Sequence, residues 1–200
     1  IGLAKNPLQV GKCVYGVFLN ESGGVVDDSL VYQIDTGFYV AIVNAGMGSV
    51  ITDHLKQYKG ERVVEITDMT DKLGKIDVQG PKAGKIIQKI IKDPEMVLEG
   101  FPYFNFKGFF NDDASPVCSV QLNDGTPILL SRTGYTGEFG FEIFIDSNAT
   151  ENLWNRILEA GEEFGALVCG LASRDSLRAG AVLPLSHQDI GDWPFLSHPW

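Results

Sequence analysis

Residues 131–144, SRTGYTGEFGFEIF, combine strand-forming residues with several glycines. The second half of this stretch favours a β-strand, yet glycines interrupt it and a lone glutamate, Glu142, breaks the apolar run. Side chains alternate between the two faces of a strand, so Glu142 shares its face with Gly140 and Phe144. Glycine weakens a strand unless backbone or a ligand approaches closely there. The stretch predicts a strand that makes room for a flat, nitrogen-rich ring and offers it a bidentate carboxylate; a solvated edge-strand glutamate is the alternative.

A second strand, predicted over residues 25–34, carries two neighbouring aspartates. By the same alternation, Asp28 shares the more apolar face with Leu30 and Tyr32, whereas Asp27 falls on the more polar face. We therefore expect Asp27 to be solvated. An unpaired carboxylate on an apolar face is costly, so Asp28 is either a functional group or a buried aspartate satisfied by backbone amides.

The pattern of elements is typical of an α+β protein with antiparallel sheets covered by helices. A hairpin, a long strand and a helix follow one another around residues 24–58 and again around 118–160. Residues 61–69 and the aromatic run 101–110 are also expected to form strands. The best contiguous domain boundary lies near residues 60–63.

Composition excludes several classes of protein. The net charge of −10 argues against a nucleic-acid-binding protein, which needs a basic surface. No apolar run reaches the length of a membrane span. The three cysteines, Cys13, Cys118 and Cys169, lie far apart without metal-ligand spacing, which is typical of reduced thiols in a cytoplasmic protein.

A predicted helix within GLASRDSLRAGAVLP, residues 170–184, places Arg174 and Arg178 one turn apart. Asp175 can pair with Arg178 across one turn of this helix. Such a set is usually a surface ion-pair network of little energetic consequence, and alternatively it anchors an anionic ligand or orients Asp28.

Taken together, these stretches resemble the glycine-cleavage T-protein superfamily of tetrahydrofolate-dependent aminomethyltransferases. The matching stretches are NESGGVVDDSLVY, VNA, VQGPKA, SRTGYTGEFGFEIF and GLASRDSLR, in that order along the chain. The resemblance implies two interleaved domains. Residues 1–62 with 171–200 would form the first folate-binding α+β unit and residues 63–170 the second, without the family's N-terminal segment and C-terminal barrel.

The resemblance also implies roles for seven residues around a central folate cavity. Asp28 matches the catalytic carboxylate beside the reactive folate nitrogens, and Glu142 matches the glutamate that grips the pterin edge. The remaining matches line the same cavity: Tyr15, Tyr32, Asn44, Tyr135 and Arg174. On this hypothesis the glycines of residues 131–144 make room for the pterin.

The implied reaction passes an aminomethyl group from the lipoyl arm of the H-protein to tetrahydrofolate, with release of ammonia. The sequence departs from the family at residues 44–53, 178–182 and 186–187, where contacts to the donor or partner are expected. One alternative is therefore a folate-dependent N-, O- or S-demethylase or methyltransferase that takes a small-molecule one-carbon donor. Another is a non-catalytic folate-binding module, although its KGCY-x-G signature is absent and Asp28 favours catalysis.

Overall fold

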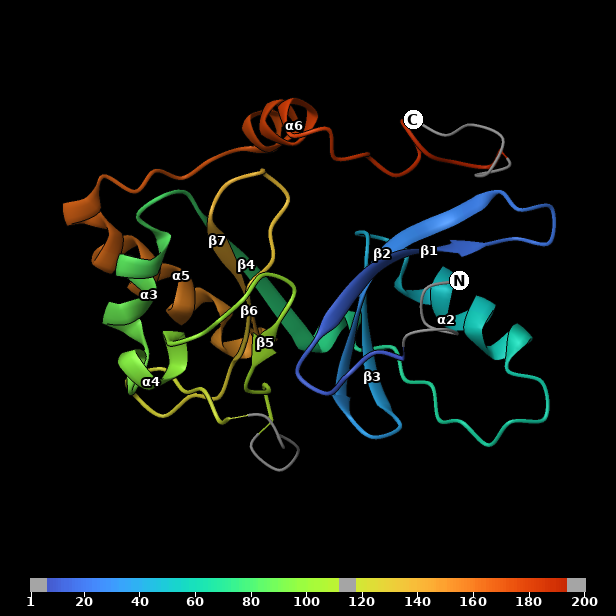
Figure 1. Ribbon diagram of the computed structural model, residues 1–200, viewed down its shortest axis with the longest axis horizontal. Coiled ribbons are helices and arrows are strands. Elements are labelled where there is room, and N and C mark those ends of the chain that lie inside the picture. The colour runs from blue at the N-terminus through green and yellow to red at the C-terminus, as the bar shows by residue number, and fades with distance from the viewer. Residues whose placement is uncertain (1–6, 112–117, 194–200) are drawn as a thin grey trace.

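The computed structural model describes residues 7–111 and 118–193, which form two antiparallel sheets flanked by helices (Figure 1). The first sheet has the strand order β1-β2-β3. Its strands are β1 (Cys13–Leu19), β2 (Val25–Asp35) and β3 (Phe38–Val43). The predicted hairpin is confirmed, because β2 and β3 are joined by a tight turn in which Gly37 has a φ of 77°.

The second sheet has the order β4-β7-β6-β5, and each neighbouring pair is antiparallel. Its strands are β4 (Leu73–Gln79), β5 (Phe106–Lys107), β6 (Leu129–Ser131) and β7 (Gly140–Asp146). The stretch at residues 131–144 starts at the end of β6, continues through a loop and becomes β7, so the predicted strand is confirmed. Because β7 lies between β4 and β6, both of its edges are hydrogen-bonded.

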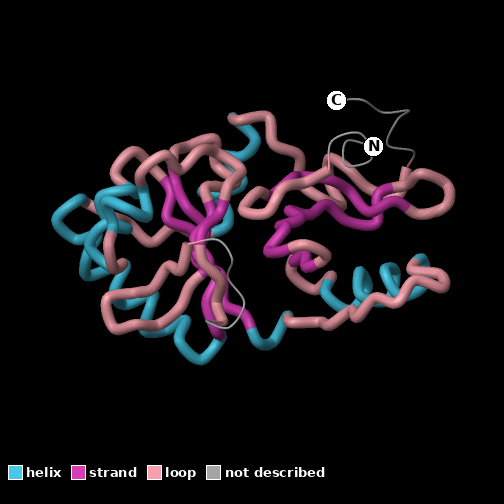
Figure 2. The backbone as a smooth tube through the Cα atoms, turned by 60° about the horizontal axis from the view of Figure 1, so that its bottom comes forward, coloured by secondary structure: helices cyan, strands magenta, loops and turns pink. Residues whose placement is uncertain are grey.

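Five α-helices complete the described chain, together with short 3₁₀ turns at Thr70–Lys72, Ser147–Ala149 and Glu162–Phe164. The helices are α2 (Gly48–Tyr58), α3 (Ala83–Ile90), α4 (Pro94–Leu98), α5 (Thr150–Gly161) and α6 (Leu171–Gly180). Helices α3, α4 and α5 cover the face of the second sheet that points away from the first sheet (Figures 1 and 2). None of the helices in the described ranges combines the length and apolarity that a membrane crossing needs.

The larger core lies between the second sheet and its helices. The apolar side of α3 faces this core, since Ile86, Ile87 and Ile90 are buried together with Ile143 and its apolar neighbours. A smaller core joins the two sheets through Cys13, Tyr32, Ile34, Phe106, Phe109, Leu129 and Phe144. The Tyr32 face of β2 therefore points toward the second sheet.

The C-terminal part of the described chain returns to the first sheet. After α6 the chain runs back above β1 and β2 (Figure 1), and the Val25 amide donates to the Gly191 carbonyl at 2.8 Å. This segment, residues 183–193, lies beside the start of β2 although it is distant in sequence. It covers part of a sheet that the local pattern alone would leave exposed.

Two predicted strands are wrong or much shorter than expected. Residues 61–69 pair with no strand, and the side chain of Val63 is fully exposed. Within residues 101–110 only Phe106–Lys107 form a strand. Phe104 has a φ of 61°, a left-handed conformation that interrupts extended pairing.

Candidate functional site

Asp28 lies half-buried on the face of β2 that points toward the second sheet. Tyr15 Oη donates to Asp28 Oδ2 at 2.7 Å, and Asn44 Nδ2 donates to Asp28 Oδ1 at 2.5 Å. Tyr15 comes from β1, which pairs antiparallel with β2, and Asn44 follows β3 directly. Burial raises the pKa of Tyr15, and the hydrogen bond to Asp28 raises it further, so the phenol stays protonated and donates. The structure thus brings three of the predicted residues into direct contact.

Asp27 is completely buried, so the prediction that it is solvated is wrong. Its carboxylate accepts from the Asn44 backbone amide at 3.1 Å, from Asn44 Nδ2 at 2.7 Å and from Ser186 Oγ at 3.1 Å. His187 Nε2 lies 3.8 Å from the same carboxylate. Asp27 is buried where the C-terminal segment meets β2, and sequence alternation cannot show that contact. Asn44 bridges the two aspartates, which fixes the position of Asp28 relative to Asp27.

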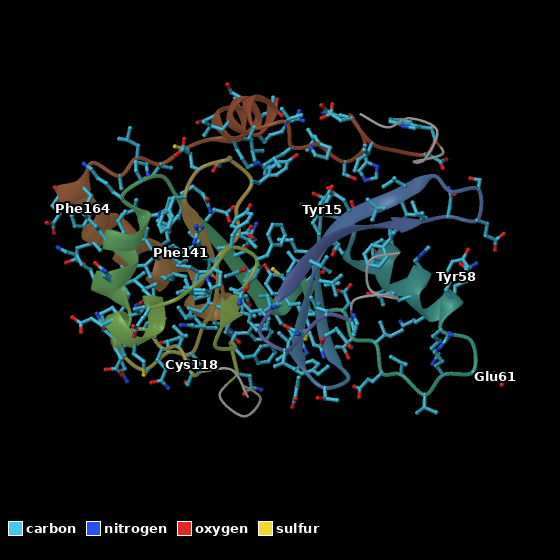
Figure 3. All side chains as sticks on the ribbon, viewed as in Figure 1. Tyr15, Tyr58, Glu61, Cys118, Phe141 and Phe164 are labelled. Atoms are coloured by element: carbon cyan, nitrogen blue, oxygen red, sulfur yellow. The ribbon has the colours of Figure 1, made fainter. Side chains whose placement is uncertain are left out.

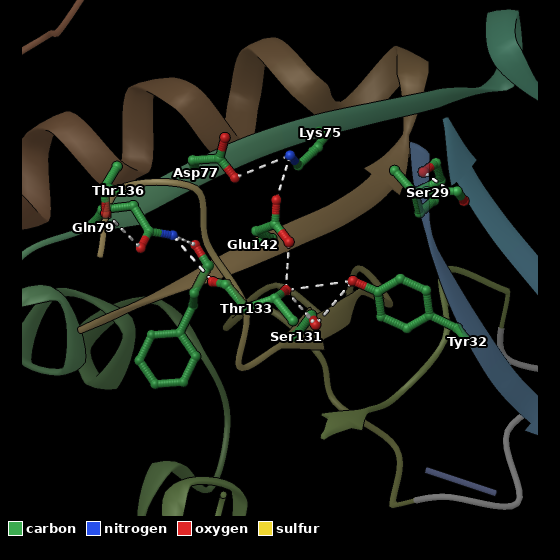
Figure 4. Close-up of polar contacts among 11 residues, drawn as sticks. Ser29, Tyr32, Lys75, Asp77, Gln79, Ser131, Thr133, Thr136 and Glu142 are labelled. Atoms are coloured by element: carbon green, nitrogen blue, oxygen red, sulfur yellow. Dashed lines mark hydrogen bonds and ion pairs between the residues drawn. The ribbon is translucent and has the colours of Figure 1, made fainter. Parts of the chain in front are cut away.

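Glu142 is buried at the centre of a polar network between the sheets (Figure 4). It forms an ion pair with Lys75 and accepts a hydrogen bond from Thr133 Oγ1, so the alternative of a solvated edge-strand glutamate is wrong. Thr133 shares a hydrogen bond with Ser131 at 2.7 Å, and Ser131 shares one with Tyr32 at 3.1 Å. The network therefore connects β7 of the second sheet to β2 of the first.

Electrostatics keep this glutamate ionised despite its burial. Burial alone would raise the pKa of Glu142, but Lys75 and the hydrogen bond from Thr133 outweigh it and lower the pKa. Asp77 lies opposite Glu142 in the β4–β7 register. Burial and Glu142 raise the pKa of Asp77 to about 6, although Lys75 acts in the opposite direction.

The glycines of residues 131–144 make room for protein side chains, which corrects the expectation that they make room for a pterin. A methyl group on Gly134 or Gly140 would collide with the end of the Gln79 side chain, and one on Gly137 would meet Ala181. Gln79 Nε2 donates to the carbonyls of Thr133 at 3.2 Å and Phe141 at 3.1 Å. The glycines therefore let Gln79 tie the loop to β7.

Tyr135 and Arg174 lie close to each other near the start of the C-terminal segment. Tyr135 Oη donates to the Pro184 carbonyl, and the guanidinium of Arg174 lies 5.5 Å from the centre of the Tyr135 ring. Burial raises the pKa of Tyr135, and the negative charge of Asp28 raises it further, because that charge disfavours ionisation of the phenol. Figure 3 shows that Tyr15 lies on the side of the first sheet nearest to the loop between β6 and β7, which contains Tyr135.

The ion pair predicted between Asp175 and Arg178 is confirmed at 2.7 Å. Arg178 also forms an ion pair with Asp189 and donates to the Leu183 carbonyl at 3.2 Å. Arg178 thus attaches α6 to the segment that buries Asp27. Its role in this structure is to hold that segment in place.

The predicted residues line neither of two surface hollows in the described part of the chain. One, of about 560 Å³, is lined by residues such as Met69, Asp71 and Asn148, and another, of about 290 Å³, lies around Met96 and Cys118. Neither contains a buried, convergent set of polar groups, which is the better sign of a binding site. Across residues 7–111 and 118–193, no group of three or more His, Cys, Asp and Glu side chains is placed to hold a metal ion.

Sequence reasoning missed Lys75, Asp77, Thr133 and Ser186, which are partners of the predicted residues. Lys75 and Asp77 are two residues apart on β4 and so share a face, which is the local signal for this pair, but the contact with Glu142 depends on the pairing of β4 with β7. Ser186 gave no local signal, since its contact with Asp27 spans 159 positions.

Comparison with known proteins gives one consistent result. The family model of the GCVT N-terminal domain matches residues 3–193. Aminomethyltransferases of Natranaerobius thermophilus and Alkaliphilus oremlandii are 41% and 38% identical over 183 residues, covering 92% of this chain and 46% of each relative. The crystal structure of glycine cleavage system aminomethyltransferase T from Bartonella henselae matches with a TM-score of 0.73 at 26% identity, covering 92% of this chain and 44% of that one. The chain therefore spans about half the length of the curated relatives that it matches.

Proposed function

This chain belongs to the GCVT N-terminal domain family, and we propose that it binds tetrahydrofolate and carries the catalytic carboxylate of an aminomethyltransferase. One observation carries the proposal. Asp28, Tyr15 and Asn44 come from three different parts of the first sheet, and they meet within hydrogen-bonding distance. A carboxylate held by two donors on a half-exposed face can act on a ligand without reorganising, which favours electrostatic catalysis.

The chemistry asked of Asp28 follows from its surroundings. Tetrahydrofolate would supply the nitrogen nucleophiles that accept a one-carbon unit. The Asp28 carboxylate would orient the amine, accept its proton and stabilise a positively charged carbon nearby. Tyr15 and Asn44 would keep the carboxylate pointing in one direction, and buried Asp27 would keep Asn44 in place.

The residues fit a folate ligand in part. The half-exposed Asp28 and the polar network around Glu142 lie on faces of the two sheets that point toward each other. We propose that Tyr15, Asn44, Tyr135 and Arg174 surround the ligand between these faces. Tyr32 and Glu142 are buried, and we propose that they support the site from the network behind it. The gap beside Gly134 and Gly140 is not part of that site, because Gln79 fills it.

We keep the division into residues 1–62 with 171–200 and residues 63–170 as a proposal, supported by the contact of the C-terminal segment with β2. A lipoyl-carrying H-protein is the proposed partner and one-carbon donor, because the relatives are aminomethyltransferases and the structural neighbour is named for the glycine cleavage system. A cytoplasmic location is part of the same proposal.

The test is a donor assay on the whole protein that contains this chain. Incubation with tetrahydrofolate and aminomethyl-lipoyl H-protein should release ammonia, and Asp28→Asn should abolish most of the release. Asp93→Asn, which removes one charge from an exposed residue at the start of α4, is the matched control. Formation of methyl-tetrahydrofolate from a methylated donor, without ammonia from the H-protein, would replace this proposal with the demethylase alternative.

A further inference from the structure

Lys75 and Asp77 form an exposed pair of opposite charges beside the buried Glu142 (Figure 4). Both residues lie on β4, two positions apart, and Asp77 is directly opposite Glu142 in the sheet. Lys75 Nζ lies 3.3 Å from Asp77 Oδ1 and also contacts Glu142. The Lys75 and Asp77 side chains are 37% and 35% exposed, whereas that of Glu142 is 4% exposed.

This arrangement limits what Glu142 can do by itself. One of its oxygens is paired with Lys75 and the other accepts from Thr133, and almost none of the side chain reaches the surface. A ligand that approaches from between the sheets meets the ends of Lys75 and Asp77 before it meets this carboxylate. The contribution of Glu142 to binding is then to hold Lys75 in position.

The exposed pair has the chemistry to recognise the edge of a ring. An ammonium group has three N–H donors, and the contacts with Asp77 and Glu142 use two of them. Burial would lower the pKa of Lys75, but Glu142 and Asp77 raise it, so the ammonium stays charged. Asp77 supplies an acceptor immediately beside that donor. A donor next to an acceptor complements an edge in which a ring carbonyl lies next to a ring N–H.

We propose that Lys75 and Asp77 are specificity-determining residues that read the carbonyl and adjacent N–H of the 4-oxo-pteridine ring. Lys75 donates to the ring oxygen, Asp77 accepts from the neighbouring ring N–H, and Glu142 acts through Lys75. This inference rests on the proposed folate function. Two further residues would then face the ligand, and they would select the ring edge in which a carbonyl lies next to an N–H.

The experiment compares two ligands that differ at one position. Calorimetric titration of the whole protein with tetrahydrofolate and with its 4-amino counterpart measures the preference for oxygen at that position. The 4-amino ring presents a donor to Lys75 and an acceptor to Asp77, so the wild-type protein should bind it about ten- to a hundredfold more weakly. Lys75→Met should weaken binding of tetrahydrofolate by about tenfold or more and bring the preference close to one.

Controls separate recognition from folding. Lys72→Met removes the same charge from an exposed residue at the end of the turn before β4 and should leave both affinities unchanged. Lys75→Arg keeps the cation and should retain part of the preference, and thermal unfolding shows whether each variant is folded. A purely structural role for Lys75 would weaken both ligands equally and leave the preference intact.

Each outcome decides between the two proposals. If tetrahydrofolate binds normally and neither Lys75→Met nor Asp77→Ala changes the preference, the inference about this pair is wrong while the folate function stands. If the wild-type protein binds no tetrahydrofolate, both proposals are wrong. Loss of the preference in Lys75→Met and Asp77→Ala, but not in Lys72→Met, supports the inference.

Discussion

Replacement of Asp27 by asparagine should destabilise the protein strongly, although the local sequence places Asp27 on a polar face. The carboxylate is completely buried and accepts three hydrogen bonds, two from Asn44 and one from Ser186. Asparagine keeps one acceptor oxygen and turns an amide donor toward donors that already occupy the site. A hydrogen bond to a charged group contributes about 1.5–3 kcal/mol, so we expect Asp27→Asn to lower the free energy of unfolding by about 2–4 kcal/mol.

Thermal and urea unfolding of the chain measure this effect. For a protein of this size 1 kcal/mol corresponds to about 2–4 °C, so the melting temperature should fall by about 5–15 °C. Asp53→Asn is the matched control, because Asp53 lies exposed on α2 and loses the same charge. Ser186→Ala should cost about 1 kcal/mol, and less than that when Asp27 is already asparagine, because the two residues share one hydrogen bond.

If Asp27→Asn unfolds within about 0.5 kcal/mol of the wild-type chain, as Asp53→Asn should, then Asp27 is solvated as the local alternation suggests. The C-terminal segment would then not bury Asp27. If the losses in free energy of unfolding from Asp27→Asn and Ser186→Ala simply add in the double variant, the two residues are not in contact, even if each single variant is destabilised.

Three further predictions concern the site and its network. Asp28→Asn should lower turnover by about two to four orders of magnitude. It should change the free energy of unfolding by no more than about 1 kcal/mol, because the side chain is half-exposed. Activity assays and urea unfolding together test this, and a normal turnover would contradict it. Carboxyl-carbon NMR should find that Asp77 titrates near pH 6, and Lys75→Met should raise that midpoint, since the ammonium opposes protonation. A midpoint near 4 would show that Glu142 and the surrounding protein do not raise this pKa. Because this pKa lies above the ordinary value of 3.8, the contribution of Asp77 to stability is present at low pH and is lost as the pH rises through about 6. Gly134→Ala should lower the free energy of unfolding, measured in urea, by about 1–3 kcal/mol, because the new methyl group collides with Gln79. In a chain that already carries Gln79→Ala, the same substitution should have little effect.

Several local elements, and the types of residue that carry chemistry, follow from patterns within short stretches of the sequence. The hairpin of β2 and β3 follows from alternating apolar residues around a turn glycine, and α3 follows from isoleucines at helical spacing after a proline. Such patterns depend on neighbours within a few residues, which is why they can be read locally. Parity also placed Asp28 on the same face as Tyr32 correctly, because a strand has only two faces.

Which faces are buried, and what each polar group contacts, depends on segments that are distant in sequence. Asp27 lies on the polar face of β2, and Ser186, more than 150 positions away, contacts its buried carboxylate. The glycines around Tyr135 indicated a close approach, but a local pattern could not reveal that the approaching group is Gln79 from another strand. Burial and pairing depend on segments that meet only in the folded chain. For that reason Glu142 could be recognised as unusual from sequence, whereas its partner Lys75 was identified only when β4 and β7 were placed side by side.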